Sequence, residues 1–255
     1  MKTRSLTQLF LLLILCSATA KAGWYECYNF RGTIGGEPIT LSVQLVNSYL
    51  DNHKKNFTVS GIYKRDKVNE PIKLTGELDL NKKKAVLYET STANKHTARF
   101  EFDFSEGTSD GVWRDLASNR SLPIHLDRTA KLRDFVDGDS AENVEILQSN
   151  SLKDLYFVGV YSMKAGSDRA QMDRLKIMRK RDGTLFQVIE LSKLDYTSGN
   201  VITIIYDNVE VYSRKTRELA LWNNIGRMGG TTAITFNPKT QKFRLNSKPH
   251  IEGPN

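Results

Sequence analysis

Few side chains in this 255-residue sequence stand at the spacings that catalysis needs. The four histidines are scattered along the chain, at His53, His96, His125 and His250. No two of them have the spacing of zinc ligands, and there is no Gly-x-Ser-x-Gly elbow, His-Glu-x-x-His helix or Cys-x-x-Cys pair. We therefore expect neither a metal nor a cofactor. His125 alternates with Ile124 and Leu126, which predicts a position on the solvent face of a strand.

Two carboxylates offer the best case for chemistry. Glu101 and Asp103 alternate with three phenylalanines, so both lie on one face of a predicted strand. A glycosidase needs two carboxylates about 5 to 10 Å apart, which this spacing can provide. The simpler interpretation is that the two carboxylates lie on the solvent-exposed face of a sheet whose buried face holds the phenylalanines. We predict that the protein is not an enzyme, with an envelope hydrolase using carboxylates as an alternative.

A basic run at 174–181 is the first candidate binding segment. Arg174 and Lys176 alternate with apolar residues, so they share one face of a predicted strand. One interpretation is a patch for an acidic partner or for anionic lipid headgroups. The other is a charged strand edge that prevents sheet-to-sheet aggregation.

An aromatic and glycine-rich stretch is the second candidate. Tyr212 and Trp222 precede Arg227 and Met228, which lie in the run 226–230 that holds three glycines. Tyrosine, tryptophan, arginine and methionine are favoured at binding interfaces, and glycines allow close approach of a partner. An irregular structural hairpin is the alternative. The predicted partner-binding residues are thus Tyr212, Trp222, Arg227, Met228, Arg174 and Lys176.

The first 22 residues predict the compartment. Lys2 and Arg4 precede an apolar run at 9–15, and Ala20 and Ala22 form a small-x-small cleavage site. The run is well short of the roughly 18 residues that span a membrane. These features predict a cleaved secretory signal and a periplasmic protein. Lipid attachment at Cys16 is less favoured, because Leu15 precedes it where such signals have a small residue.

Cysteine content and charge narrow the class of protein further. Cleavage of the leader leaves only Cys27, which cannot form an internal disulfide and is predicted to be a small buried residue. It also lowers the formal net charge from +8 to +5. A nucleic-acid binder usually concentrates a stronger surplus on one face, so we expect no nucleic-acid partner. No other segment is apolar enough to predict stable membrane insertion.

Periodicity predicts an all-β, mainly antiparallel protein of two small barrel- or sandwich-like domains. Across 23–128, apolar residues alternate with polar ones, as at Ile39, Leu41, Val43 and Leu45. Seven or eight short strands separated by turn signals predict an antiparallel β-meander domain there. Residues 156–255 repeat the pattern and predict a second β-rich domain, which includes a strand at 201–206. Between them, 129–155 reads as a linker with a short helix, because Val144 and Leu147 have helical spacing within 143–155.

Several short motifs resemble a known module. They are Val59-Ser60-Gly61-Ile62-Tyr63-Lys64, Glu70-Pro71-Ile72-Lys73-Leu74-Thr75-Gly76, Leu87-Tyr88-Glu89, Gly111-Val112-Trp113 and Leu122-Pro123-Ile124-His125-Leu126. Over about 28–127 the chain resembles a β-rich module of exported bacterial proteins of unassigned function. This chain has Arg65 where that group usually has an aromatic residue. The resemblance implies an exported β-rich domain with no known active site. By analogy, the whole chain is also similar to periplasmic toxin-immunity proteins.

The leading functional hypothesis is an exported, non-enzymatic binding protein of the periplasm. Most specifically, we expect an immunity or inhibitor protein that neutralises an interbacterial toxin, such as a type VI secretion effector, or a lytic enzyme. Occlusion of that protein partner needs an interface of about 1,600 Å² with a few aromatic or arginine anchors, and no acid, base or metal. The alternative is a β-barrel that binds a glycan, a lipid or another small envelope ligand, which requires an unfilled interior.

Overall fold

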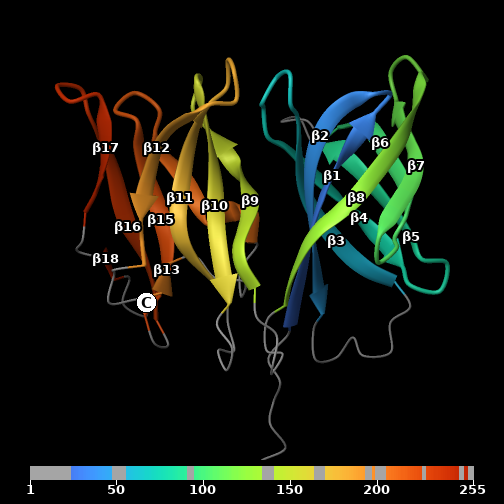
Figure 1. Ribbon diagram of the computed structural model, residues 1–255, viewed down its shortest axis with the longest axis horizontal. Coiled ribbons are helices and arrows are strands. Elements are labelled where there is room, and N and C mark those ends of the chain that lie inside the picture. The colour runs from blue at the N-terminus through green and yellow to red at the C-terminus, as the bar shows by residue number, and fades with distance from the viewer. Residues whose placement is uncertain are drawn as a thin grey trace, which may run out of the picture.

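The computed structural model describes residues 24–47, 56–90, 95–133, 141–163, 170–192, 197–198, 205–225, 228–246 and 250–251. The leader at 1–22, including Cys16, lies outside these residues. The described chain is all-β and antiparallel, which confirms the predicted fold class. A barrel and a two-sheet unit lie side by side (Figure 1), with the barrel formed by the blue to green part of the chain.

The first unit is a closed barrel in which each strand pairs with the next. The last strand returns to pair antiparallel with the first, with Cys27 opposite Leu132. The strands are β1 (Trp24–Ile34), β2 (Glu37–Asn47), β3 (Asn56–Arg65), β4 (Ile72–Asp79), β5 (Lys84–Thr90), β6 (His96–Asp103), β7 (Thr108–Asp115) and β8 (Ser121–Arg133).

Apolar side chains fill the barrel interior. Phe30, Phe100 and Phe102 are fully buried there, together with Leu41 and Leu74. Their positions follow the period-two alternation, because every second residue of a barrel strand points inward. A packed interior does not support the alternative in which the barrel encloses a small ligand.

Three glycines allow neighbouring barrel strands to approach closely. A Cβ atom on Gly32, Gly76 or Gly111 would fall between 1.9 and 2.1 Å from a carbonyl oxygen of the adjacent strand. No side chain fits at such distances, so these positions require glycine.

The second unit consists of two facing sheets. One has four strands in the order β12-β11-β10-β9, and the other has six, with β15 and β16 at its centre. Their apolar faces meet in one core, where Phe157 and Leu175 of the first sheet pack with Leu221 and Ile234 of the second. The strands are β9 (Ala141–Ser151), β10 (Leu155–Met163), β11 (Gln171–Arg179), β12 (Leu185–Glu190), β13 (Thr197–Ser198), β14 (Val209–Ser213), β15 (Glu218–Ile225), β16 (Met228–Asn237), β17 (Lys242–Leu245) and β18 (His250–Ile251).

Two predicted elements differ from the structure. The short helix expected within 143–155 is wrong, because that segment contains strand β9. Ile146, Leu147 and Gln148 are all buried in β9, and the register shifts twice along its pairing with β10. A bulged strand buried on both faces lacks simple alternation and can mimic helical spacing. The strand expected at 201–206 is also corrected, since Ile205–Asp207 form a 3₁₀ turn and 201–204 lie outside the described residues.

The barrel contributes residues to the core of the second unit. Cys27, Ile62 and Leu132 belong to the same buried cluster as Phe157 and Tyr161. This confirms the prediction that Cys27 is buried, and burial raises the pKa of its thiol to about 12. Gln44 is also buried on the outer wall of the barrel, and its Oε1 accepts a 2.8 Å hydrogen bond from the Ile205 amide.

Candidate binding crevice

A crevice of about 700 Å³ separates the barrel from the four-stranded sheet. The barrel wall comes from β1, β2, β3 and β8, and the opposite wall comes from β9, β10 and β11. This volume falls within the range of small-ligand sites. The lining mixes apolar, polar and charged side chains, including Asn29, Arg31, Lys64, Asp66, Ala130, Glu142, Asn143, Glu145, Leu147, Tyr156, Val158 and Met178.

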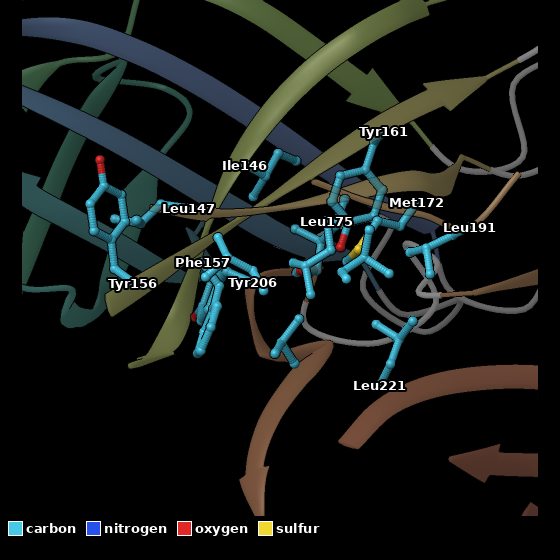
Figure 2. Packing of buried hydrophobic residues seen from close by; sticks show 14 of the residues in the cluster. Ile146, Leu147, Tyr156, Phe157, Tyr161, Met172, Leu175, Leu191, Tyr206 and Leu221 are labelled. Carbon is cyan, nitrogen blue, oxygen red and sulfur yellow. The ribbon is translucent and has the colours of Figure 1, made fainter. Parts of the chain in front are cut away.

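Strand β10 faces the six-stranded sheet on one side and the barrel on the other. Tyr156 lies on the side that faces the barrel and lines the crevice. Phe157 points into the core between the sheets, whereas Tyr156 lines the crevice. Figure 2 shows the Tyr156 hydroxyl directed away from Phe157 and Tyr206. The residue is only 3% exposed, and the Lys64 Nζ atom lies 5.4 Å from its ring centroid. The ring is thus held between the sheet and the barrel.

The hydroxyl of Tyr156 forms no hydrogen bond within the described part of the chain. Burial, with smaller effects from the negative charges of Asp66, Glu145 and Asp182, raises the pKa of this phenol to about 12. The hydroxyl therefore remains protonated at neutral pH and can donate a hydrogen bond. The hydroxyl oxygen is not among the buried unpaired atoms of the described chain, so it is accessible from the crevice.

One hydrogen-bonded bridge joins the two walls of the crevice, where Asn29 of β1 contacts β9. Asn29 Nδ2 donates a 2.6 Å hydrogen bond to the Glu145 carbonyl oxygen. Its Oδ1 atom accepts a 2.6 Å hydrogen bond from Ser42 Oγ, which orients the amide. Asn29 therefore ties the barrel wall to the opposite sheet.

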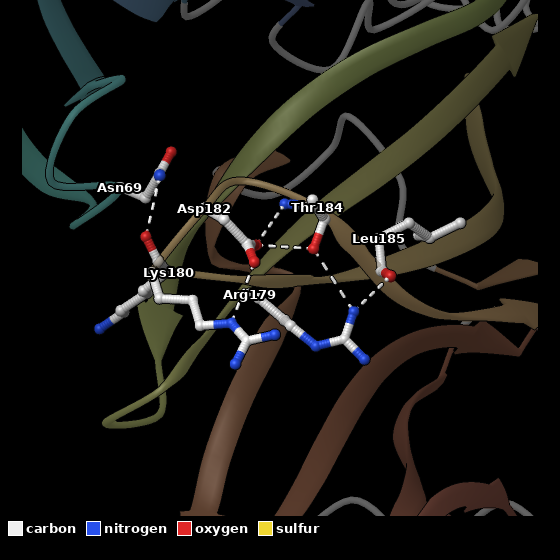
Figure 3. Close-up of polar contacts among 7 residues, drawn as sticks. Asn69, Arg179, Lys180, Asp182, Thr184 and Leu185 are labelled. Atoms are coloured by element: carbon white, nitrogen blue, oxygen red, sulfur yellow. Dashed lines mark hydrogen bonds and ion pairs between the residues drawn. The ribbon is translucent and has the colours of Figure 1, made fainter.

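A second bridge lies beside Lys64. Asn69 Nδ2 donates a 3.0 Å hydrogen bond to the Lys180 carbonyl oxygen (Figure 3). Asn69 Oδ1 accepts a 2.8 Å hydrogen bond from Lys64 Nζ, which also pairs with Asp66 at 2.6 Å. Lys180 in turn pairs with Glu70 of the barrel unit. The two walls are therefore joined at two separate places.

The two basic residues predicted on β11 lie beside the crevice. Arg174 and Lys176 share one face of the strand, as the alternation predicts. Lys176 Nζ pairs with Glu145 Oε1 at 2.5 Å, and Arg174 Nη2 donates to Asn143 Oδ1. Both of their partners line the crevice. The charge of Lys176 is thus compensated, whereas Arg174 has a hydrogen bond to a neutral amide and no ion pair within the described residues.

The rest of the basic run stabilises the turn after β11. Arg179 donates a 2.8 Å hydrogen bond to the Leu185 carbonyl, and Arg181 pairs with Asp182 at 2.9 Å (Figure 3). Hydrogen bonds from the Thr184 hydroxyl and amide lower the pKa of the Asp182 carboxyl to about 2, with a smaller effect from Arg181. The charge of Arg181 is thus compensated, whereas the contacts of Arg179 in the described chain are with neutral groups and the Phe186 ring.

The predicted aromatic residues lie elsewhere, on the six-stranded sheet. Tyr212 of β14 is 77% exposed and Trp222 of β15 is 37% exposed. Val209 pairs with Leu221 between them, so the two aromatic residues are about 13 Å apart along the strands. Arg227 lies outside the described residues, and Met228 begins β16 opposite Ile225. The structure therefore does not join Tyr212 and Trp222 with Arg174 and Lys176 in one site.

The carboxylates considered for hydrolysis lie on the outer wall of the barrel, at a hollow of about 460 Å³. Glu101 pairs with Arg99 at 2.7 Å and with Lys84 at 3.3 Å. These ion pairs explain the position of Glu101 without a catalytic role. His125 lies on the solvent face as predicted, where its hydrogen bond to Asp110 raises its pKa.

Within the described ranges, no three His, Cys, Asp or Glu side chains gather closely enough to hold a metal ion. That same part of the chain contains no helix with the length and apolar character needed to cross a bilayer.

Sequence reasoning missed the residues that form the crevice. Tyr156 is the second residue of the apolar segment 155–163, so its sequence context is that of an ordinary core residue. Asn29 is a buried polar residue within β1, and its position between Tyr28 and Phe30 is the one available signal. That signal cannot identify Glu145 as the partner, because the two are 116 residues apart.

Comparison of the chain with protein-family models, with curated proteins and with solved structures gives no match in any of the three.

Proposed function

We propose that this protein is an exported, non-catalytic binding protein that inhibits a bacterial toxin or a lytic enzyme by occlusion, and that the crevice forms part of its binding surface. One observation carries the proposal: the hydroxyl of Tyr156 faces a 700 Å³ crevice, where it is accessible and forms no hydrogen bond in the described chain. A partner that supplies an acceptor can form a hydrogen bond with this accessible donor.

The fixed geometry of the crevice supports a role in binding. The bridges from Asn29 to Glu145 and from Asn69 to Lys180 hold the two walls in place before any partner arrives. A surface that is already formed loses less conformational entropy on association, so more of the contact energy appears as affinity. The pairing of Glu101 with two cations also favours a structural over a catalytic role for the best carboxylate candidate.

Co-purification with the product of a neighbouring open reading frame tests the proposal, because an immunity protein is normally encoded beside its toxin. We expect a stable complex in which the toxin or lytic activity is lost at equimolar protein. Val158→Arg places a long charged side chain in the crevice and should abolish binding. Val112→Arg makes the same change at an exposed position on β7 and serves as the matched control.

Two results would overturn the proposal. One is turnover of peptidoglycan or phospholipid by the purified protein, which is the outcome that a carboxylate hydrolase requires. The other is normal inhibition by the Val158→Arg variant, which would place the binding surface outside the crevice. Mass spectrometry of the envelope fraction tests the predicted compartment, with a mature chain that begins at Gly23 as the expected result.

A further inference from the structure

Four hairpin turns of the second unit lie together at one end of its two sheets, uppermost in Figure 1. The Lys180 amide donates a 2.9 Å hydrogen bond to the Asp154 carbonyl, which joins the turn after β11 to the turn after β9. Arg217, in the turn after β14, pairs with Asp154 at 3.0 Å. Its guanidinium carbon also lies 4.6 Å from the ring centroid of Phe236, next to the turn after β16. These contacts make one continuous surface, the turn end, which comprises 152–154, 179–184, 214–218 and 237–242.

The turn end holds the basic surplus of the protein. It contains nine lysines and arginines against three carboxylates, a formal net charge of +6. The chain without its predicted leader carries +5, so the residues outside the turn end sum to −1. Extending each range by two residues on both sides adds only one charge, that of Arg244. The cations are Lys153, Arg179, Lys180, Arg181, Arg214, Lys215, Arg217, Lys239 and Lys242, and the carboxylates are Asp154, Asp182 and Glu218.

Most of this positive charge is not compensated by ion pairs. Arg181 pairs with Asp182, Arg217 pairs with Asp154, and Lys180 pairs with Glu70 of the barrel. Six other cations have no ion-pair partner within the described residues, and all of them except Arg179 are exposed. They are Lys153, Arg179, Arg214, Lys215, Lys239 and Lys242. Of the three carboxylates, only Glu218 is likewise without an ion pair in that part of the chain, so the surface attracts anions.

The types of side chain favour a lipid surface over a protein as the anionic partner. Four of the six uncompensated cations are lysines, which are depleted in protein–protein interfaces. They lie on separate turns, as suits a flat array of phosphate groups, and clusters of lysine and arginine bind anionic headgroups through charge alone. Tyr212 adjoins this surface in β14 and is 77% exposed. Tyrosine is enriched where proteins meet the membrane–water interface.

We propose that the turn end docks the protein on an anionic phospholipid surface, where its lysines and arginines contact the headgroup phosphates without entering the hydrocarbon. The predicted leader supports this choice of partner, because it brings the chain to the bacterial envelope. The inference goes beyond the proposed function, since it assigns a second surface that needs neither the crevice nor its partner.

Sedimentation with vesicles tests the docking, with the chain that lacks only its leader. We expect binding to vesicles of phosphatidylcholine mixed with phosphatidylglycerol, and none to phosphatidylcholine alone. Added salt should weaken the binding, because it screens exposed charges.

A matched pair of double variants tests the contribution of the turn end. Lys239→Gln with Lys242→Gln removes two of its exposed cations. We expect about twentyfold weaker binding, because each lysine near an anionic surface contributes roughly fivefold. Lys82→Gln with Lys83→Gln removes the same charge from the exposed turn between β4 and β5, and should leave vesicle binding unchanged.

A fluorescent label tests which end contacts the bilayer. Thr240→Cys places a thiol in the turn after β16, and Asn81→Cys places one in the turn after β4 as the control. Cys27 is buried, so an environment-sensitive thiol reagent labels the introduced cysteine. With anionic vesicles we expect the emission to shift to the blue at Thr240→Cys and to stay unchanged at Asn81→Cys.

Four results would overturn the docking proposal. They are equal binding to neutral and anionic vesicles, equal affinities of the two double variants, a blue shift at Asn81→Cys alone, and tighter binding to duplex DNA than to anionic vesicles. None of them bears on inhibition by occlusion, because Lys239 and Lys242 do not line the crevice.

Discussion

The side-chain amide of Gln187 forms two hydrogen bonds with the backbone of Phe243. Gln187 Nε2 donates to the Phe243 carbonyl at 2.8 Å, and Gln187 Oε1 accepts from the Phe243 amide at 2.8 Å. Gln187 belongs to β12 of the four-stranded sheet and Phe243 belongs to β17 of the six-stranded sheet. The Gln187 side chain thus forms the same pair of donor and acceptor hydrogen bonds with β17 that the backbone of a neighbouring strand would form.

The Gln187→Glu variant should therefore be less stable than the natural protein. The substitution keeps the shape of the side chain but replaces the Nε2 donor by an oxygen that faces the Phe243 carbonyl. We expect the free energy of unfolding to fall by about 1 to 3 kcal/mol, measured by urea titration. Gln241→Glu is the control, because it removes an exposed hydrogen bond to the Pro238 carbonyl, where water can replace the lost donor. Equal stabilities of the two variants would show that the hydrogen bonds between Gln187 and Phe243 contribute nothing to the free energy of unfolding.

The bridge between Asn29 and Glu145 should contribute both stability and affinity. Asn29→Asp replaces the Nδ2 donor by an oxygen that faces the Glu145 carbonyl at the crevice. We expect a loss of about 1 to 3 kcal/mol in the free energy of unfolding, together with weaker partner binding. Asn119→Asp, at an exposed turn, should leave both quantities unchanged. Urea titration and titration calorimetry measure the two effects, and unaltered affinity in Asn29→Asp would separate the bridge from the binding surface.

Gly76→Ala tests the close approach of the barrel strands. The added Cβ would lie 2.0 Å from the Val86 carbonyl oxygen, so β4 and β5 must move apart. We expect a loss of about 2 to 3 kcal/mol, typical of overpacking in a core. Gly107→Ala adds the same methyl group where nothing lies within 4 Å, and should change stability by less than about 1 kcal/mol. A thermal shift for Gly76→Ala no larger than that of the control would contradict the close approach.

Burial of Cys27 predicts a loss of stability at alkaline pH. The pKa of the folded thiol is raised to about 12, above its value in the unfolded chain. The folded state therefore holds this proton more tightly, and its stabilising contribution is complete below the unfolded pKa and declines as pH rises toward 12. We expect the free energy of unfolding to fall more steeply between pH 9 and pH 11 in the natural protein than in Cys27→Ala. Parallel curves for the two proteins would mean that the thiol is not desolvated.

Much of the fold follows from alternation and turns in the sequence. Residues such as Ile39, Leu41 and Val43 alternate with polar neighbours, and all three point into the barrel core. The closure of β1 onto β8 is different, since no local pattern specifies a partner so distant in the chain. Strand β9 could not be predicted for another reason. Val144 and Leu147 have helical spacing because the strand is bulged and has buried residues on both faces.

The candidate site was less predictable than the fold. Alternation correctly places Arg174 and Lys176 on one face, but their partners Asn143 and Glu145 come from a strand that was expected to be a helix. Tyr156 has the sequence context of a core residue, and only the packing of the barrel against β10 turns its hydroxyl into a crevice donor. Exposed aromatic residues such as Tyr212 satisfy a compositional rule for interfaces without lying near the crevice.

The seam of the barrel joins its first strand to its last, with Glu26 of β1 opposite Arg133 of β8. Such long-range pairing is slow, because the intervening chain must close into a loop before any contact compensates for the lost entropy. The N-terminal unit cannot complete its fold until β8 has emerged from the ribosome. We expect this delay to keep the nascent polypeptide unfolded for longer. A translocase that exports a chain with the predicted leader requires such an unfolded polypeptide.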